Sequence, residues 1–310
     1  MKTKNLLRNI SPFNNSKDMP VVLYGVKKLL AFFLIYGISA LIGEGIIIGS
    51  FYALSYDPLS GIMPTGSVAE LLPYYGFAVF FAVALLYCKL VEKRDISSLG
   101  FNRKAADGIK GAFIAVILLA VIVSICCAAG SVSFIGFAAN ADILYLALLF
   151  LAFFIQSMAE ETICRGFLLR SLLEKASVPF AIFVSSTAFA LPHLSSLLEA
   201  DAEFSVVGII NLYLVSAIFS LLFMLRSNIY IVSGMHCMWN FVLNGAMGLS
   251  VSGTGSNEAS VLIFRVNAEN LLSGGVYGLE ASVITTAVLS AVTIILIKLY
   301  GKKGFENGLQ

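Results

Sequence analysis

The chain has 310 residues, of which 59% are hydrophobic and only 12% charged, and its formal net charge is +2. A soluble globular protein carries about twice that charged fraction, so this composition excludes an ordinary soluble domain. The small net charge gives no support for a nucleic-acid partner. Length and apolar content together predict an all-α, polytopic membrane protein built as one helix bundle.

Eight apolar runs are long enough to cross a bilayer, which takes about 20 helical residues. In chain order they cover residues 28–54, 71–91, 110–130, 143–165, 179–197, 205–225, 229–249 and 281–299. The fifth and seventh runs contain Ser, Pro, His and Asn among their apolar residues. Polar groups find no partner in lipid, so these two helices are expected to turn their polar sides toward protein or a wet cavity.

Lysine and arginine gather at the N-terminus, at the C-terminus and in alternate connections, while the other connections are acidic and hold one basic residue, Arg265. Basic residues favour the cytoplasmic side, so an even number of spans with both termini cytoplasmic is expected. The resulting division is a cytoplasmic tail over 1–27, one membrane domain over 28–300 with an external loop at 250–280, and a cytoplasmic tail over 301–310.

Two adjacent glutamates, Glu160 and Glu161, lie near the end of the fourth run. Ionised carboxylates are costly at membrane depth and usually mark a functional site. Glu161 and Arg165 are spaced i, i+4, which suits an ion pair within one helix. Glu160 points about 100° away from Glu161 on a helix and is predicted to be the freer carboxylate.

The only two histidines of the chain, His193 and His236, fall inside the fifth and seventh runs. Phe189 precedes His193 by four residues, so its ring is expected to pack against the imidazole. His236 and Asn240 have the same spacing and share a face. Trp239 and Tyr230 are expected to pack or to anchor the membrane interface.

The fourth and fifth runs form a predicted hairpin that turns near residues 176–177. Glu160 and His193 each lie roughly 25 Å along a helix from that turn, so they are expected at equal depth. His236 and Asn240 enter from the same side on the seventh run. We therefore expect Glu160, His193, His236 and Asn240 to meet at one level.

These residue types suit the activation of water. A carboxylate in a poorly solvated site can act as a general base, and a histidine can share its proton or orient the water. A His–Asn pair supplies donors for an oxyanion. Metal-free catalysis is the preferred hypothesis, with no cofactor required. The alternative is zinc held by Glu160, His193 and His236, although the His-Glu-x-x-His motif is absent.

Three motifs on separate runs, together with SSLGF at residues 97–101, resemble the CPBP intramembrane proteases, the family of CAAX proteases and bacteriocin-processing enzymes. The motif core covers residues 143–248, and the family includes the type II CAAX prenyl endopeptidase. The motifs are E-E-x-x-x-R (Glu160, Glu161, Arg165), F-x-x-x-H (Phe189, His193) and H-x-x-x-N (His236, Asn240).

The resemblance implies an eight-helix fold with a cavity open toward the cytosol, and hydrolysis of a peptide bond in a membrane-associated peptide or lipidated protein. Glu160 and His193 would activate water, and His236 and Asn240 would stabilise the oxyanion. The remaining motif residues would orient the site: Glu161, Arg165 and Phe189. The family is described both as metalloproteases and as glutamate-dependent proteases, so the resemblance leaves the metal open.

The resemblance leaves the substrate open as well. Eukaryotic members trim prenylated C-terminal tripeptides, whereas many bacterial members act in bacteriocin maturation or self-immunity. The compact N-terminus favours a prokaryotic member, so a bacterial plasma membrane is the expected location. The sequence does not indicate an oligomeric state.

Two rival functions use the same residues. Intramembrane Glu and His also form proton relays in transporters, but transporters often carry inverted repeats with broken helices, and here the polar residues cluster in one half of the chain. The second rival is a catalytically idle protein that captures a bacteriocin and thereby confers immunity.

Overall fold

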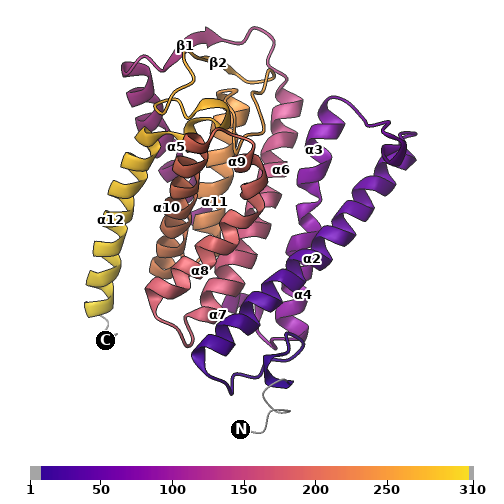
Figure 1. Ribbon diagram of the computed structural model, residues 1–310, viewed down its shortest axis with the longest axis vertical. Coiled ribbons are helices and arrows are strands. Elements are labelled where there is room, and N and C mark those ends of the chain that lie inside the picture. The colour runs from indigo at the N-terminus through magenta and orange to yellow at the C-terminus, as the bar shows by residue number, and fades with distance from the viewer. Residues whose placement is uncertain (1–7, 307–310) are drawn as a thin grey trace.

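Apolar helices make up most of the structure, a computed structural model that describes residues 8–306 (Figure 1). Seven helical segments within those residues are long and apolar enough to cross a membrane, which confirms a polytopic helix bundle. They comprise α2 (Val21–Ala53), α3 (Ser67–Tyr75) with α4 (Phe77–Leu90), α5 (Asp107–Ala128), α6 (Ile143–Glu161) with α7 (Arg170–Leu172), α8 (Val178–Ala190) with α9 (Leu194–Leu198), α10 (Ala202–Arg226) and α12 (Val283–Glu306).

The predicted seventh span differs from the others. Its α-helical part, α11 (Ile229–Asn240), has 12 residues and continues as a π-helix over Phe241–Ala246. Twelve α-helical residues rise about 18 Å, which is less than the hydrocarbon thickness. Seven segments therefore meet the length and hydropathy of a span, and the count of eight stays a prediction.

The two ends of the described chain lie at the same end of the bundle, while the short strands lie at the other end (Figure 1). An even number of crossings requires this arrangement. Which end faces the cytoplasm stays a prediction from the basic residues.

The first spanning helix, α2, begins at Val21, seven residues before the predicted start of the first span, so the predicted tail 1–27 includes its first turns. The early boundary was missed because Lys27 and Lys28 were counted as tail charges, yet both side chains are fully buried. Lys28 pairs with Glu92 at 2.6 Å, and the Lys27 ammonium donates to the side chain of Asn14. A paired cation can lie inside the bundle, where an unpaired one would be excluded.

The predicted external loop 250–280 contains regular structure. Its strand β2 (Leu262–Val266) pairs antiparallel with β1 (Val132–Phe137), and a bulge lies between Phe134 and Gly136. β-branched and aromatic residues fill both strands, as strand propensity favours. The small sheet ties the connection after α5 to the loop before α12.

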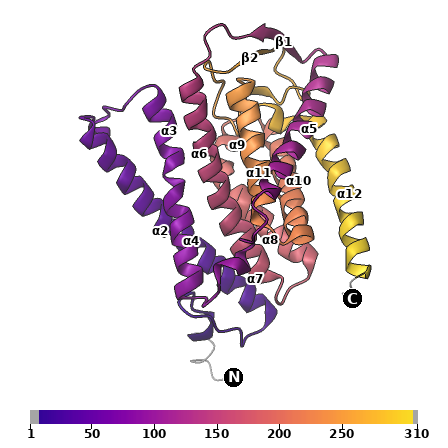
Figure 2. The same ribbon diagram turned by 180° about the vertical axis from the view of Figure 1, so that it is seen from behind.

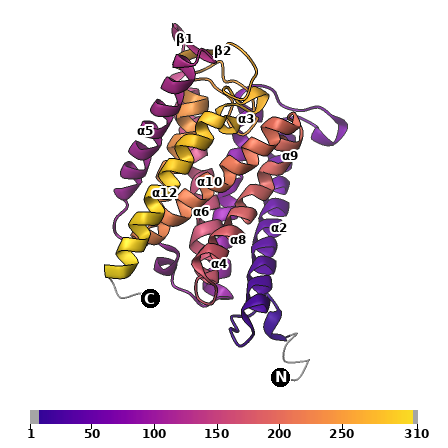
Figure 3. The same cartoon turned by 60° about the vertical axis from the view of Figure 1, so that its left-hand side comes forward.

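The most buried spanning helix is α10, where 56% of an 18-residue apolar stretch is buried. The corresponding share in α12 is 17%, and α12 packs along the outer side of α10 (Figure 3). Seen from behind, α6 and α11 lie between α3 and α4 on one side and α5 and α12 on the other (Figure 2). The helices that carry the motifs therefore occupy the middle of the bundle.

Two glycines allow α5 and α11 to touch. A Cβ on Gly111 would lie 1.9 Å from the carbonyl oxygen of Ile231, and one on Gly234 would lie 2.1 Å from that of Gly108. Small residues at such crossings let helix backbones approach closely in a membrane. This contact fixes α11, and with it His236 and Asn240.

Candidate active site

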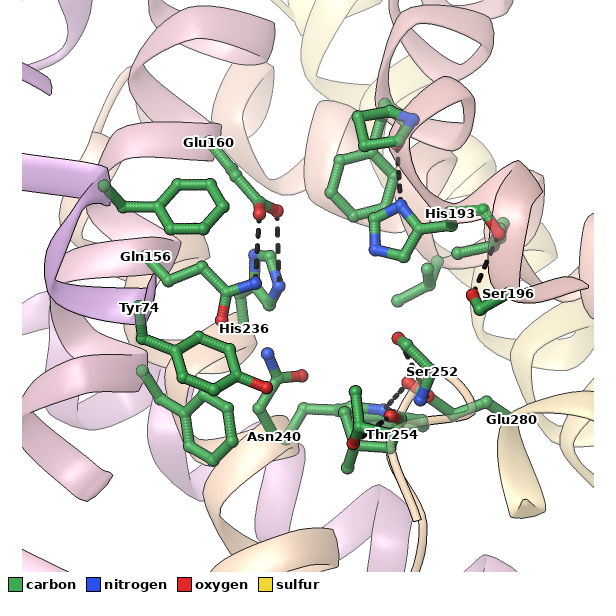
Figure 4. Close-up of a pocket in the computed structure, with 18 of the residues that line it drawn as sticks. Tyr74, Gln156, Glu160, His193, Ser196, His236, Asn240, Ser252, Thr254 and Glu280 are labelled. Atoms are coloured by element: carbon green, nitrogen blue, oxygen red, sulfur yellow. Dashed lines mark hydrogen bonds and ion pairs between the residues drawn. The ribbon is translucent and has the colours of Figure 1, made fainter. Parts of the chain in front are cut away.

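A pocket of about 320 Å³ lies among α6, α8, α10 and α11, and it contains all four of the predicted catalytic side chains (Figure 4). Glu160 lies in the long span that ends at Leu172, and His193 in the span that ends at Leu198. The pocket is therefore inside the bundle at membrane depth. Its lining includes Glu160, His193, His236, Asn240, Gln156, Tyr74, Phe189, Phe219, Trp239, Ser252, Thr254 and Glu280.

Glu160 reaches the pocket from the last turn of α6, and 14% of its side chain is exposed. Its Oε1 accepts a hydrogen bond from Gln156 Nε2 at 3.1 Å, and its Oε2 lies 3.8 Å from His236 Nε2. Oε2 has no hydrogen-bond partner among the described residues. Glu161 Oε2 is unpartnered among these residues too, but Glu161 Oε1 is ion-paired with Arg165, so Glu160 is the freer carboxylate of the pair.

Glu161 points away from the pocket and is completely buried. Its Oε1 accepts from Arg165 Nη1 at 3.0 Å, which confirms the predicted ion pair within one helix. The Arg165 guanidinium also donates to the hydroxyl of Ser216 at 2.6 Å and lies 4.4 Å from the ring centre of Phe189. Arg165 therefore joins α6, α8 and α10 behind the pocket.

His236 connects the two glutamates. Its Nδ1 lies 3.0 Å from Glu161 Oε1, and its Nε2 faces Glu160. The ring stacks on Phe219 with centroids 5.4 Å apart and meets the edge of Phe189 at 5.7 Å. A carboxylate on one ring nitrogen fixes the orientation of the imidazole, so the other nitrogen is held toward the pocket.

His193 lies in the 3₁₀ turn Leu191–His193, across the pocket from Gln156 and Tyr74 (Figure 4). Its ring packs on Phe189 with centroids 5.2 Å apart, as the spacing predicts, and its Nδ1 lies 3.1 Å from the carbonyl oxygen of Phe189. Among the described residues no hydrogen bond or ion pair joins His193 to Glu160. The two line the same pocket without touching each other.

Asn240 follows His236 by one helical turn and is only 5% exposed. Its side-chain amide points into the pocket and makes no hydrogen bond within residues 8–306 (Figure 4). Burying an amide without a partner is costly. The amide is therefore available to a molecule bound in the pocket.

A π-helix lies at two of the three motifs. One covers Thr162–Leu169, begins directly after the glutamate pair and contains Arg165, and the other covers Phe241–Ala246 directly after Asn240. Such segments are rare and occur often at functional sites, because they change the direction of the side chains that flank them. The sequence contains no simple signal for them, and they were not predicted.

Several lining residues were missed by the sequence analysis. Gln156 precedes Glu160 by four residues, a spacing that could have revealed it. Trp239, expected only to pack or anchor, lines the pocket and donates through Nε1 to Glu280 at 2.9 Å. Glu280 also accepts from the backbone N–H of Ser252 at 2.6 Å. Only the fold brings these loop residues to α11.

The side of the pocket that carries Ser252, Thr254 and Glu280 differs from expectation. The first two lie in the predicted external loop and Glu280 at its end, at the end of the bundle opposite the two chain ends (Figure 1). The resemblance implied a cavity open toward the cytosol. With cytoplasmic termini, this pocket instead borders the external end, because loop 250–280 folds over the inner helices.

The donors proposed for zinc are not gathered in one place. Glu160, His193 and His236 have suitable chemistry, but no group of three His, Cys, Asp or Glu side chains within residues 8–306 is placed to hold a metal ion. Glu160 and His236 are neighbours, whereas His193 lies on another wall. This arrangement does not fit a three-ligand site.

Comparison with known families agrees with the motifs. Residues 142–242, about a third of the chain, match the family model described as type II CAAX prenyl endopeptidase Rce1-like, which confirms the resemblance carried by the motifs. The match supports similarity to CAAX prenyl endopeptidases at the level of the family. No curated protein matches the chain.

Proposed function

We propose that this protein is an intramembrane endopeptidase that hydrolyses one peptide bond of a membrane-associated peptide or lipidated protein. The proposal rests chiefly on one observation. A carboxylate with a free oxygen, two imidazoles and an unpaired amide line one pocket at membrane depth. Intramembrane ionisable residues indicate function by default, and this set contains both a base and hydrogen-bond donors.

In the proposed reaction, Glu160 accepts a proton from water as the water oxygen attacks the scissile carbonyl carbon. The carbonyl oxygen becomes an oxyanion and accepts hydrogen bonds from Asn240 and His236. His193 orients the water from the opposite wall. Glu160 then gives its proton to the departing amine as the C–N bond breaks, so the carboxylate returns to its starting state.

We propose CAAX-type processing, or bacteriocin or immunity-type processing, in a bacterial plasma membrane as the cellular role. The family match supports CAAX-type proteolysis in general. The choice among these substrates needs a direct measurement.

Replacing Glu160 by Gln is expected to abolish hydrolysis, by at least about a hundredfold, because the amide cannot accept the proton from water. His193→Ala should lower turnover similarly, and both proteins should remain folded. The measurement compares new protein termini in membranes of cells that express the wild type or Glu160→Gln at equal levels. Glu199→Gln is the matched control, because Glu199 is exposed and lies outside the pocket.

Termini that are present with the wild type and Glu199→Gln but absent with Glu160→Gln would establish proteolysis and identify the substrate. Full turnover of Glu160→Gln would contradict the mechanism. Equal termini in all three strains would favour the carrier or immunity hypotheses, which proton flux in proteoliposomes then separates.

Chelation is expected to leave the turnover of the purified protein unchanged, because the candidate donors are not placed to share one metal ion. The measurement is hydrolysis of the identified substrate before and after prolonged dialysis against a chelator. Complete loss of turnover that zinc alone restores would instead establish a metalloprotease.

A further inference from the structure

The candidate pocket continues into a second, larger one. The second pocket has a volume of about 580 Å³, and the two share Tyr74 and Thr254 in their walls. It lies toward the same end of the bundle as loop 250–280. The two compartments are therefore adjacent, and together they are called the cleft, with an inner part at Glu160 and an outer part beyond Tyr74.

One stripe of helix α6 lines the whole cleft. Its inner members are Glu160, Gln156 and Phe153, and its outer members are Leu149, Tyr145 and Asp142. Successive members are three or four residues apart, which keeps them on one helical face. From Asp142, the N-cap residue just before α6, to Glu160 the stripe spans 18 residue steps and thus about 27 Å. An extended peptide of about eight residues has this length.

Two other segments, the end of α11 with the π-helix after it and loop 250–280, also contribute side chains to both compartments. Asn240, the last residue of α11, lines the inner compartment, and Asn244, four residues on in the π-helix, lines the outer one. The unpaired amide of Asn240 is buried and directed into the cleft, so the inner end is prepared for a polar main-chain group of a bound molecule. Thr254 and Glu258 continue the loop wall outward.

The two compartments differ in chemistry. The inner one is rich in aromatic rings, and its two carboxylates are the catalytic candidate Glu160 and Glu280, which is hydrogen-bonded to Trp239 and Ser252. The outer one is lined by three carboxylates: Glu70, Asp142 and Glu258. Glu70 accepts from the Tyr145 hydroxyl at 2.7 Å, and no lysine or arginine lines either compartment among the described residues. A cleft lined by one sign of charge attracts the opposite charge.

We propose that this cleft binds its substrate as an extended segment that is apolar at the cleaved bond and carries basic side chains about six to eight residues away. The inference rests on the proposed proteolysis and adds the class of substrate. The inference favours a long segment, apolar at one end and basic at the other, over a free tripeptide, because a tripeptide would span only about 10 Å of the cleft.

The test uses an equimolar library of synthetic 20-residue peptides with an apolar centre and with Lys, Gln or Glu at each outer position. The wild-type protein in nanodiscs is incubated with the library, and products are identified by mass spectrometry. We expect peptides with Lys six to eight residues to one side of the cleaved bond to be cut about tenfold faster than those with Glu. The preference should shrink as salt is raised.

Glu258→Lys should abolish or invert that preference, because Glu258 is exposed in the outer compartment and its charge is reversed. Glu269→Lys is the matched control, since Glu269 is exposed in the same loop but lines neither compartment. Cleavage without a charge preference, or a preference that Glu258→Lys does not change, would overturn the inference and leave proteolysis intact.

Binding separates this inference from the proposed function. A fluorescent Lys-bearing peptide should bind Glu160→Gln protein more tightly than its Glu-bearing counterpart, and Glu258→Lys should remove the difference. If the wild type cuts no peptide but the binding preference is present, the proteolytic proposal fails and the cleft assignment stands. Absence of the binding preference refutes the cleft assignment.

Discussion

At the scale of single residues, the most costly feature is the charge of Arg165, which is buried behind the pocket. Arg165 is fully buried, and it is compensated by Glu161, by the hydroxyl of Ser216 and by the rings of Phe189 and Phe219. A buried charge is tolerated only when it is paired and hydrogen-bonded. The second glutamate of the motif thus has a role distinct from the first.

Arg165→Met is expected to lower the free energy of unfolding by about 3–5 kcal/mol, because it removes the cation paired with the buried Glu161 carboxylate and leaves only His236, among the described residues, beside it. The double variant Glu161→Gln with Arg165→Met should lose much less than the sum of the single losses. The measurement is a double-mutant cycle of unfolding in detergent, with Arg265→Met in the exposed strand β2 as the control. Additive losses would show that the two side chains are not coupled.

At the scale of elements, the position of α11 decides the geometry of the site. The glycine contacts with α5 hold the helix from one side, and α6 contacts it from another. The π-helix that begins at Phe241 then turns the chain toward loop 250–280. His236 and Asn240 therefore depend on a crossing that contains no catalytic residue.

Gly234→Ala is expected to destabilise the protein by about 1–3 kcal/mol, because the new methyl group overlaps the backbone oxygen of Gly108. Helices α5 and α11 would have to move apart to relieve this overlap. Turnover should fall with it, since His236 moves with α11. The measurement is thermal unfolding in detergent together with substrate hydrolysis.

Gly37→Ala in α2 is the matched control, because its new methyl group meets nothing within 4 Å. It should be neutral or slightly stabilising, since alanine favours a helix over glycine. Equal effects of Gly234→Ala and Gly37→Ala would refute the close crossing of α5 and α11.

At the scale of the whole molecule, ion pairs join separate segments of the chain at the end of the bundle that carries the termini. Lys28 and Glu92 join α2 to the segment after α4. Glu174, in the connection after α7, pairs with Lys17 at 2.8 Å and with Arg94. These pairs connect the N-terminal segment to the connections between helices.

The pKa of Glu174 should make stability depend on pH. Burial alone would raise this pKa, but hydrogen bonds from Lys17 and Tyr24 and the charge of Arg94 lower it below its ordinary value. A lowered folded-state pKa stabilises the protein above the unfolded pKa, about 4.3, and this contribution is lost as pH falls from there through the folded pKa. Melting temperature should therefore fall on acidification below about pH 5.

Glu174→Gln should remove part of that dependence, because the amide does not titrate. The measurement compares the melting temperatures of the two proteins from pH 3 to pH 7. Parallel curves for the wild type and Glu174→Gln would contradict a stabilising role for the Glu174 charge.

Much of the fold follows from local properties of the sequence. Hydropathy placed most spans within a few residues, because a helix that faces lipid must be apolar along its length. Helical spacing predicted the Glu161–Arg165 pair and the contact of Phe189 with His193, since both partners lie on one helix. These predictions needed only the period of the helix.

The tertiary structure alone decided the rest. The approach of His236 to both glutamates, the entry of Trp239 and Glu280 into the pocket, and the burial of Lys28 against Glu92 join residues far apart in the chain. The outer acidic compartment likewise forms only because the N-terminal end of α6 lies beside α3 and loop 250–280. The sequence determined which side chains are costly in a membrane. The packing of separate helices determined which of these side chains share one cleft, because local periodicity carries no information on contacts between helices.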